Sequence, residues 1–454
     1  MSGAAGGAPR ASRPGKPRRW AVRTEGVIAP DERLPWGQTL VLGVQHVFAM
    51  FGSTVLAPVL MGFDPNVAIL FSGIGTLLFF LVVGGRIPSY LGSSFAFIAV
   101  VNAATGYAGH GPNPDVDVAL GGIVAAGVLY ALIAVVVMVA GYGWIERLMP
   151  PVVTGAVVAV IGLNLAPVAI RGISGSGLDT GVGVVTMLAV AAVAVYAPGM
   201  LRRLPILLGG AIGYVAYLAL ANGAGWGTPV DFSALSRAAW IGPPRFRTPA
   251  FRSDAMSLIA PVAVVLVAEN LGHVRAVAAM TGRNLDRYLG RAFLGDALAM
   301  IVAASRGGTG LTTYAENIGV MAVTRVYSTL LFVVAAVAAI AMGFSPKFGA
   351  LVATIPPAVL GGVSTVLFGL IAATGGRIWV QNRVDFSVAR NLVTAAVALT
   401  LGAGDFAIRI GGFSLGGIGT ATFGAIVLYQ LLREREPQPE EGVVADSAVG
   451  PPAS

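Results

Sequence analysis

Two glutamates lie in segments that are otherwise apolar, and they are the residues of this chain best suited to chemistry. Glu269 lies within the largely apolar run 258–279, and Glu316 ends a stretch rich in Gly, Ser and Thr. Ionisable side chains at membrane depth are costly, and they are functional candidates by default. We therefore expect these two carboxylates to form the functional site, with a purely structural role in joining helices as the alternative.

A histidine follows the first glutamate at a spacing of four residues. His273 and Glu269 therefore lie on one face of a helix, close enough to interact directly or through water. Such a pair can bind and release a proton near neutral pH, which favours a proton-coupled process. His46 is expected to bond a neighbouring helix rather than to line a cavity, and Asp296 is expected to orient a polar partner.

The composition places these residues in a membrane protein. Only 11% of the 454 residues are charged and 56% are hydrophobic, against roughly 25% charged in an average soluble domain. The 62 glycines suit closely packed membrane helices, because small residues let helix backbones approach each other. The fold class predicted is an all-α polytopic membrane protein. The chain holds no cysteine, so disulfides, thiolate catalysis and cysteine metal sites are excluded, and no metal site is expected.

Apolar runs long enough to cross the membrane, some of them interrupted by Gly or Pro, number about fourteen. The first seven lie near 37–58, 66–85, 88–105, 118–140, 150–170, 180–198 and 204–222, and the second seven near 255–278, 289–305, 309–325, 327–345, 350–373, 388–403 and 415–432. Residues 223–254 form a long external loop.

Both tails are assigned to the cytoplasm by the distribution of charge. With an even number of segments, most of the 29 lysines and arginines fall on the side that the two termini share, as expected for the cytoplasmic side. Residues 1–36 are predicted to be a disordered cytoplasmic tail, and 433–454 a second cytoplasmic tail. The basic residues of the first tail could bind nucleic acid, but a positive flank that orients the first membrane helix is the better explanation. No nucleic-acid partner is expected.

An internal repeat relates the two halves. Residues 150–161 align without gaps on 356–367, with six of twelve positions identical. Both segments are fifth in their half, and seven segments per half is an odd number, so the second copy must enter the membrane from the opposite side. An inverted seven-plus-seven repeat is typical of transporters, whose substrate sites lie near the membrane midplane at broken helices.

The third segment of each half contains such a break. Residues 88–97 and 307–317 are too rich in Gly, Ser and Thr for continuous helices, and parts of both alternate in a strand-like way. Non-helical backbone at membrane depth is tolerated only where protein or a cavity covers it. We expect short crossed strands here, with free N–H groups that can bind a carbonyl.

At these residues the chain resembles the nucleobase/ascorbate transporter (nucleobase:cation symporter-2) family. The signature of that family is matched by Glu316-Asn317-Ile-Gly319, followed by Thr324-Arg325, and further matches lie at 45–46, 90–95 and 268–273. Within the family the chain is most similar to bacterial uracil permeases, and especially to the pyrimidine-utilisation permeases, through 345–350, 377–385 and 401–406. Purine carriers of the family usually have Gln where Glu316 stands.

The resemblance implies an organisation and a mechanism. It implies a core domain from segments 1–4 and 8–11 (37–140 and 255–345) and a gate domain from segments 5–7 and 12–14 (141–222 and 346–432). It also implies elevator-like alternating access, proton symport with no cofactor besides the coupling proton, and a homodimer in the lipid of the bacterial cytoplasmic (inner) membrane. The substrate implied is uracil or a similar pyrimidine base.

The resemblance also assigns roles to residues. Glu269 and Glu316 would accept hydrogen bonds from the ring N–H groups of the base, and His273 would assist Glu269. The other residues implied at the site are the backbone amides of Phe95 and Ala315, the pocket residues Ser53, Ser94 and Tyr314, and the supporting residues His46, Asn317 and Phe368. Two positions depart from the pattern of uracil permeases, which have Tyr where Phe368 stands and, in some members, His where Asn270 stands.

Other functions remain open from the sequence. The first alternative is a proton symporter for a purine base such as xanthine or uric acid, and the second is a carrier of sulfate or bicarbonate, although two acidic residues disfavour an anion. A membrane enzyme would need a catalytic motif, and neither His-Glu-x-x-His nor a Gly-Lys-Ser/Thr phosphate loop is present. A passive channel would differ from a symporter in not accumulating its substrate.

Overall fold

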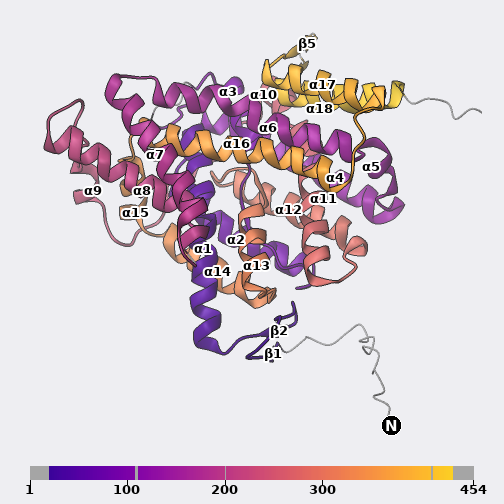
Figure 1. The fold of residues 1–454 in the computed structure, drawn as a ribbon, viewed down its shortest axis with the longest axis horizontal. Coiled ribbons are helices and arrows are strands. Elements are labelled where there is room, and N and C mark those ends of the chain that lie inside the picture. The colour runs from indigo at the N-terminus through magenta and orange to yellow at the C-terminus, as the bar shows by residue number, and fades with distance from the viewer. Residues whose placement is uncertain (1–19, 108–110, 200, 411–412, 433–454) are drawn as a thin grey trace, which may run out of the picture.

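The computed structural model describes residues 20–107, 111–199, 201–410 and 413–432 as a mostly helical protein (Figure 1). The tail expected at 433–454, and residues 1–19 of the tail expected at 1–36, lie outside the described residues. The first half contains the helices α1 (Trp36–Met61), α2 (Pro65–Val82), α3 (Ala96–Thr105), α4 (Val116–Ala140), α5 (Gly143–Leu148), α6 (Pro151–Ile173), α7 (Gly177–Tyr196) and α8 (Pro205–Leu218). Short turns η1 (Leu201–Arg203) and η2 (Ala219–Gly223) flank α8.

The second half repeats this pattern after an irregular loop that contains α9 (Ser233–Arg237). Its helices are α10 (Ser253–Ile259), α11 (Val262–Thr281), α12 (Leu289–Ala304), α13 (Ala315–Thr324), α14 (Thr329–Gly343), α15 (Pro346–Ala353), α16 (Pro357–Gln381), α17 (Ala389–Ala403) and α18 (Gly417–Leu431). The turn η3 (Asp286–Tyr288) precedes α12. The strands are β1 (Ala21–Val22), β2 (Glu32–Arg33), β3 (Leu91–Ser93), β4 (Leu311–Thr313), β5 (Ile408–Ile410) and β6 (Phe413–Leu415).

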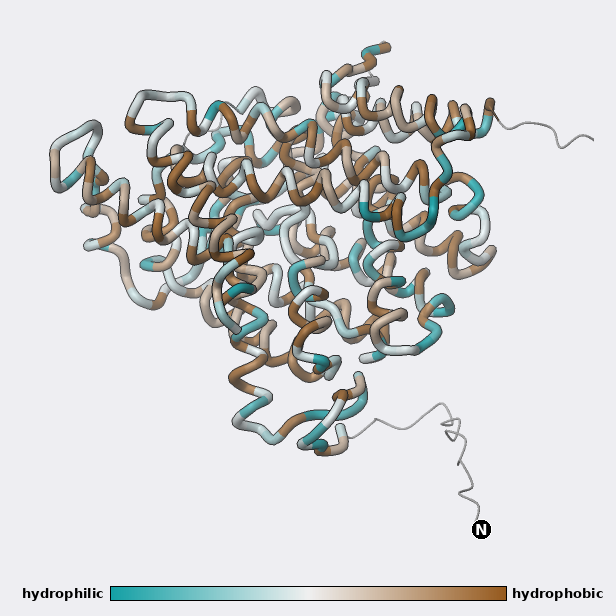
Figure 2. The backbone as a smooth tube through the Cα atoms, viewed as in Figure 1, coloured by the Kyte–Doolittle hydropathy of each residue, from teal (hydrophilic) through white to brown (hydrophobic). Residues whose placement is uncertain are grey.

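Within the described residues, eight helical spans are long and apolar enough to cross a membrane, or nine if the pair α14 and α15, bent by 80°, counts as one span. The exact count of fourteen therefore stays a prediction. Segments three and ten fall below this length because each is half strand and half helix, and α12, α17 and α18 fall below it with 16, 15 and 15 residues. Figure 2 shows hydrophobic residues along the long helices, while hydrophilic ones gather in connections and in the segment before α1.

The twelfth segment begins later than the sequence pattern indicated. We expected it to start near residue 350, but that stretch belongs to α15, and the long helix α16 starts at Pro357. Proline lacks a backbone N–H and is favoured in the first turn of a helix, so the pair Pro356-Pro357 starts a new helix instead of continuing the preceding one.

The inverted repeat is visible in the packing of α6 against α16, which lie side by side in Figure 1. A Cβ atom added at Gly155, near the start of α6, would lie 2.9 Å from the carbonyl oxygen of Gly375, near the end of α16. A Cβ atom at Gly361, near the start of α16, would lie 2.8 Å from the carbonyl oxygen of Ala169, near the end of α6. The repeat alignment superposes Gly155 on Gly361, and the same offset, continued along both helices, superposes Ala169 on Gly375. The two helices are therefore antiparallel, and each contact is the repeat image of the other.

The helices pack in two sets with fewer contacts between them. The first helix set comprises α1–α4 and α10–α14, in which α12 packs on α2 and α4, and α14 packs on α1 and α2. The second helix set comprises α6–α8 and α16–α18, in which α6 packs on α16, α17 and α18. Contacts of α11 with α6 and α18, and of α3 with α6, join the two sets.

Residues 20–35 depart from the expectation of a disordered tail. β1 and β2 form a parallel pair, and Ile28 forms a β-bridge with Val326, before α14. Ile28 is 1% exposed and packs with Leu34, Val326 and Leu331. A hydrophobic side chain and backbone pairing to the loop before α14 therefore order this segment, and neither is evident from its polar composition.

Candidate functional site

The two broken helices meet at a buried pair of short antiparallel strands. β3 pairs with β4 in the register Leu91 to Thr313, Gly92 to Thr312 and Ser93 to Leu311. The pairing continues on both sides, since Ser94 N donates to Gly310 O at 2.8 Å and Tyr314 N donates to Tyr90 O at 3.0 Å. The strand-like breaks predicted from the sequence are confirmed, and each strand satisfies the backbone groups of the other.

Tyr314 closes one side of this strand pair. A Cβ atom at Gly92 would lie 2.4 Å from the Tyr314 ring, so only glycine allows the ring to lie across the strand. The Tyr314 hydroxyl donates to the carbonyl oxygen of Ser93 at 2.8 Å, and the Thr54 hydroxyl on α1 lies 3.3 Å from it. Tyr314 is only 3% exposed, so it braces β3 against β4.

A helix starts directly after each strand, so two helix N-termini lie at the strand pair. Phe95 is the residue before α3, and Ala315 is the first residue of α13. The first N–H groups of a helix have no intrahelical acceptor and carry a partial positive charge. Ser94 uses its side chain locally, since its Oγ accepts from Ala96 N at 3.3 Å. Phe95 packs edge-on against Phe368 of α16, with ring centroids 5.9 Å apart.

Glu316 lies on the first turn of α13 and is held from α1. The Ser53 hydroxyl donates a hydrogen bond to its carboxylate. The next residue, Asn317, donates through Nδ2 to Nδ1 and to the carbonyl oxygen of His46, both at 3.1 Å. His46 therefore joins α1 to α13 through Asn317.

Glu269 lies on α11, in contact with α13, and is half-buried like Glu316. The two carboxylates interact electrostatically. One oxygen of Glu269, Oε2, is buried without a hydrogen-bond partner in the described part of the chain, and so is the Thr312 hydroxyl on β4. Buried polar atoms are rarely left unpaired. A ligand or a water bound beside α11 would satisfy the free oxygen of Glu269.

His273 bonds to β4 rather than to Glu269. Its Nδ1 lies 2.9 Å from the Thr313 hydroxyl, and that hydroxyl lies 3.3 Å from Oδ1 of Asn270. No hydrogen bond joins His273 to Glu269 in the described part of the chain, so the direct pairing considered from the sequence is not the geometry found. His273 and Glu269 do share α11, and both are half-buried.

Asn270 extends this chain of hydrogen bonds to two further helices. Its Nδ2 donates to Oδ2 of Asp296 on α12 at 2.5 Å and to the Tyr130 hydroxyl on α4 at 3.0 Å. Asp296 therefore has the polar partner that the sequence led us to expect. The sequence does not single out Thr313 or Tyr130, although Tyr130 is an isolated polar side chain in the apolar helix α4.

Open space adjoins the site along α11 and α13. A Cβ atom added at Gly272 or at Gly319 would meet no other atom within 4 Å. Ala315 and Gly319, one turn apart on α13, are exposed. The described residues contain no group of three or more His, Cys, Asp or Glu side chains that could hold a metal ion.

Two half-buried carboxylates beside a strand pair between two broken helices, inside an inverted helical repeat, define a multi-pass membrane transporter. The sequence comparison agrees, since residues 37–411 match the Permease family, and the chain belongs to that family. It is 63% identical over 410 residues to the putative pyrimidine permease RutG of Escherichia coli K12, covering 90% of this chain and 93% of that protein. It is 40% identical over 437 residues to the uracil permease of Bacillus caldolyticus, covering 93% and 98%. The family resemblance found from the sequence is thereby confirmed.

Solved structures show the same fold. The transmembrane domain of the cyanobacterial bicarbonate transporter BicA superposes with a TM-score of 0.61 over 86% of this chain and 96% of that domain, at 16% identity. SLC26A9 superposes with a TM-score of 0.58 over 87% of this chain and 64% of that protein, at 13% identity. At these identities the likeness concerns the fold alone.

Proposed function

We propose that this protein takes up uracil or a related pyrimidine base together with a proton across the bacterial cytoplasmic membrane. The observation that carries the proposal is the juxtaposition of the Glu269 and Glu316 carboxylates beside the two helix N-termini at the β3–β4 pair. The relatives named as pyrimidine and uracil permeases support a pyrimidine base as the substrate.

The groups of the site complement the edge of a uracil ring. Uracil alternates N–H donors with C=O acceptors. The two carboxylates can only accept hydrogen bonds when ionised, and the backbone amides of Phe95 and Ala315 can only donate. A base that lacks one of these groups would leave a buried polar group unpaired, which costs about 1–3 kcal/mol and gives specificity. The Phe95 ring, which packs against Phe368, would lie beside the uracil ring.

The charges of the site support coupling to a proton. Two carboxylates lie in a membrane-embedded region, and none of the ion pairs among the described residues involves Glu269 or Glu316. Burying two unpaired negative charges is costly, and one bound proton removes part of the cost. Glu269, with a partner-free oxygen and with His273 one turn away, is the group that we propose to carry the proton.

The two helix sets correspond to the moving parts of an elevator. The first helix set carries the strand pair and both glutamates, and we propose that it is the core domain that moves with the bound base. The second helix set is proposed to be the gate domain and the site of dimer formation. Both termini are proposed to lie in the cytoplasm.

An anion substrate is disfavoured although the bicarbonate transporter BicA has the same fold. Two carboxylates at the strand pair repel an anion, whereas a neutral base with ring N–H groups is attracted. A purine base such as xanthine also has alternating N–H and C=O groups, so it is the competitor that the experiment must include.

Uptake of radiolabelled uracil in cells lacking other uracil carriers tests the proposal. Wild type should accumulate uracil, and an uncoupler should abolish this accumulation. Excess unlabelled thymine, xanthine or hypoxanthine is added to find which base competes with uracil. Glu269→Gln and Glu316→Gln should lose most uptake at equal expression. Glu146→Gln is a matched control, because that carboxylate lies at the surface in an ion pair with Arg275. Unchanged uptake in both site variants would refute the site, and uncoupler-insensitive accumulation would refute the symport.

A further inference from the structure

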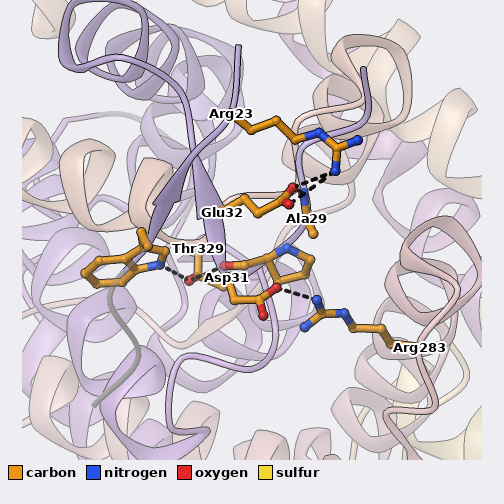
Figure 3. Close-up of polar contacts among 8 residues, drawn as sticks. Arg23, Ala29, Asp31, Glu32, Arg283 and Thr329 are labelled. Atoms are coloured by element: carbon orange, nitrogen blue, oxygen red, sulfur yellow. Dashed lines mark hydrogen bonds and ion pairs between the residues drawn. The ribbon is translucent and has the colours of Figure 1, made fainter. Parts of the chain in front are cut away.

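The ordered segment before α1, residues 20–35, lies across the ends of the two helices that carry the site glutamates. We propose that this segment, the N-terminal strap, positions Glu269 and Glu316 relative to each other and thereby sets the affinity for the transported base. The inference rests on the proposed function of these glutamates. The residues of the N-terminal strap lie outside the proposed substrate site. Figure 3 shows the polar contacts of the strap, and Figure 1 shows β1 and β2 at the end of the molecule where α1 begins.

The backbone of the strap is hydrogen-bonded to the connection between α13 and α14. Ile28 N donates to the carbonyl oxygen of Arg325 at 3.0 Å, and Tyr327 N donates back to the carbonyl oxygen of Ile28 at 2.8 Å. Thr329 N donates to the carbonyl oxygen of Pro30 at 3.1 Å. Three backbone hydrogen bonds within five residues fix this connection as a strand fixes its neighbour in a sheet.

Side chains reinforce this attachment. The Thr329 hydroxyl donates to the carbonyl oxygen of Pro30 at 2.9 Å, and the Trp20 indole N–H donates to the same hydroxyl at 3.1 Å. The Trp20 ring stacks on Phe80 near the end of α2, with centroids 6.1 Å apart. The strap is thereby attached to α2 as well as to α14.

An ion pair ties the strap to the end of α11. Arg283 lies just beyond the C-terminal cap of that helix, Gly282, and its guanidinium pairs with the carboxylate of Asp31 (Figure 3). Both side chains are about one-third exposed, at 33% and 34%, so water screens the pair only in part. Glu32 is used differently, since it accepts from Ala29 N at 2.9 Å and pairs with Arg23 inside the strap itself.

Because α13 is short, the position of its C-terminal end affects the position of Glu316 in its first turn. Its 10 residues span about 15 Å from Glu316 to the strap. A helix this short moves as a rigid body, so a shift at its end is transmitted to Glu316. The C-terminal cap of α13 is Arg325, whose backbone is left-handed with φ of 55°, which is uncommon for a residue other than glycine. The strap binds the carbonyl oxygen of this residue and so holds the end of α13 in place.

The strap contacts described above all go to α2, α11, α13 and α14, which belong to the first helix set. The strap therefore connects helices that are proposed to move together and does not bridge the two helix sets. Its effect is to fix the distance between the ends of α11 and α13, and hence between the two carboxylates that accept the ring N–H groups.

The test measures uracil affinity of the full-length purified protein by titration calorimetry, with the folded fraction measured by size-exclusion chromatography. Asp31→Asn and Arg283→Gln should each weaken binding about threefold to tenfold. Combining them should add little, because each removes the same ion pair. The exchanged pair Asp31→Arg with Arg283→Asp should restore most of the affinity, which a loss of folded protein alone would not do.

Arg252→Gln is the matched control, since Arg252 forms an exposed ion pair with Asp254 at the start of α10, which lies far from β1 and β2 in Figure 1. Its affinity should equal that of wild type. Ile28→Pro removes the N–H group bound by Arg325 and should weaken binding without any change in charge. Equal affinities of wild type, Asp31→Asn, Arg283→Gln and Ile28→Pro would overturn the inference. Absence of uracil binding to wild type would instead overturn the proposed function, so the two failures are distinguishable.

Discussion

The Ser53 hydroxyl on α1 donates a hydrogen bond to the Glu316 carboxylate on α13, which joins two residues that are 263 positions apart. Ser53 is fully buried, and its neighbour Thr54 lies within hydrogen-bond distance of the Tyr314 hydroxyl. Consecutive residues of α1 thus hold the glutamate and the aromatic ring that precedes it by two positions. The orientation of Glu316 is set from another helix as well as by its own backbone.

Replacing Ser53 by Ala should therefore weaken uracil binding without unfolding the protein. A hydrogen bond to a charged group contributes about 1.5–3 kcal/mol, which corresponds to a loss of affinity of about 10- to 150-fold if the bond persists in the complex. Titration calorimetry checks this value. Ser305→Ala is the control, because its hydroxyl bonds to Val302 O at the end of α12, away from Glu316. An affinity of Ser53→Ala equal to that of Ser305→Ala would show that this bond plays no part in binding.

Replacing Asn270 by Ala should lower stability. Asn270 is 0% exposed and donates to both Asp296 and Tyr130, so its loss removes one hydrogen bond from a buried carboxyl group and one from a buried hydroxyl group that keeps only its bond to Leu266 O at 3.4 Å among the described residues. A buried polar group that loses a hydrogen bond costs about 1–3 kcal/mol. The melting temperature in detergent should fall clearly, whereas Asn391→Ala, at an exposed helix start, should change it little. A melting temperature at the wild-type value would mean that water replaces the amide.

A cysteine at Gly319 should report on the open space beside the site. The chain has no cysteine, so a single substitution gives one reactive thiol in the natural background. Gly319 is exposed and a Cβ atom there meets nothing within 4 Å, so Gly319→Cys should react with a maleimide, and uracil should slow the reaction. Ala268 is 0% exposed, so the thiol of the control Ala268→Cys should stay unreactive. Labelling of Gly319→Cys at the same rate with and without saturating uracil would contradict this placement of the base.

The contact between the antiparallel helices α6 and α16 should require glycine at position 162, near the centre of α6. A Cβ atom at Gly162 would lie 2.3 Å from the carbonyl oxygen of Phe368, the residue that packs on Phe95. Gly162→Ala should therefore separate the two helices and reduce both the yield of folded protein and the affinity for uracil.

Gly376→Ala, on the same helix α16, provides the comparison for this substitution. A Cβ atom at Gly376 would meet nothing within 4 Å, so alanine should be tolerated, or should stabilise the helix by about 0.5–1 kcal/mol. Yields and melting temperatures of the two variants check the prediction. Equal behaviour of Gly162→Ala and Gly376→Ala would show that the helix contact can relax.

Much of the site follows from residue types alone. Glu269 and Glu316 are conspicuous because carboxylates are rare in apolar segments, and the strand-like breaks are visible because Gly, Ser and Thr replace helix formers there. The hydrogen-bond partners of the site residues cannot be recognised from residue types. Thr313 is an ordinary residue of a strand, and only the register of β3 with β4 brings it to His273.

The sequence by itself determined that the chain crosses a membrane, that its halves are inverted copies and that two glutamates lie inside it. Hydrophobicity, repeated motifs and the rarity of buried charge are local properties, so a single chain displays them. The tertiary structure decided which side chains hold each glutamate, where α16 begins, and that residues 20–35 are ordered. Those outcomes depend on contacts between residues hundreds of positions apart, as Ser53 and Glu316 show. The polar composition of 20–35 indicates a free tail, whereas the burial of one isoleucine and an ion pair to Arg283 order it.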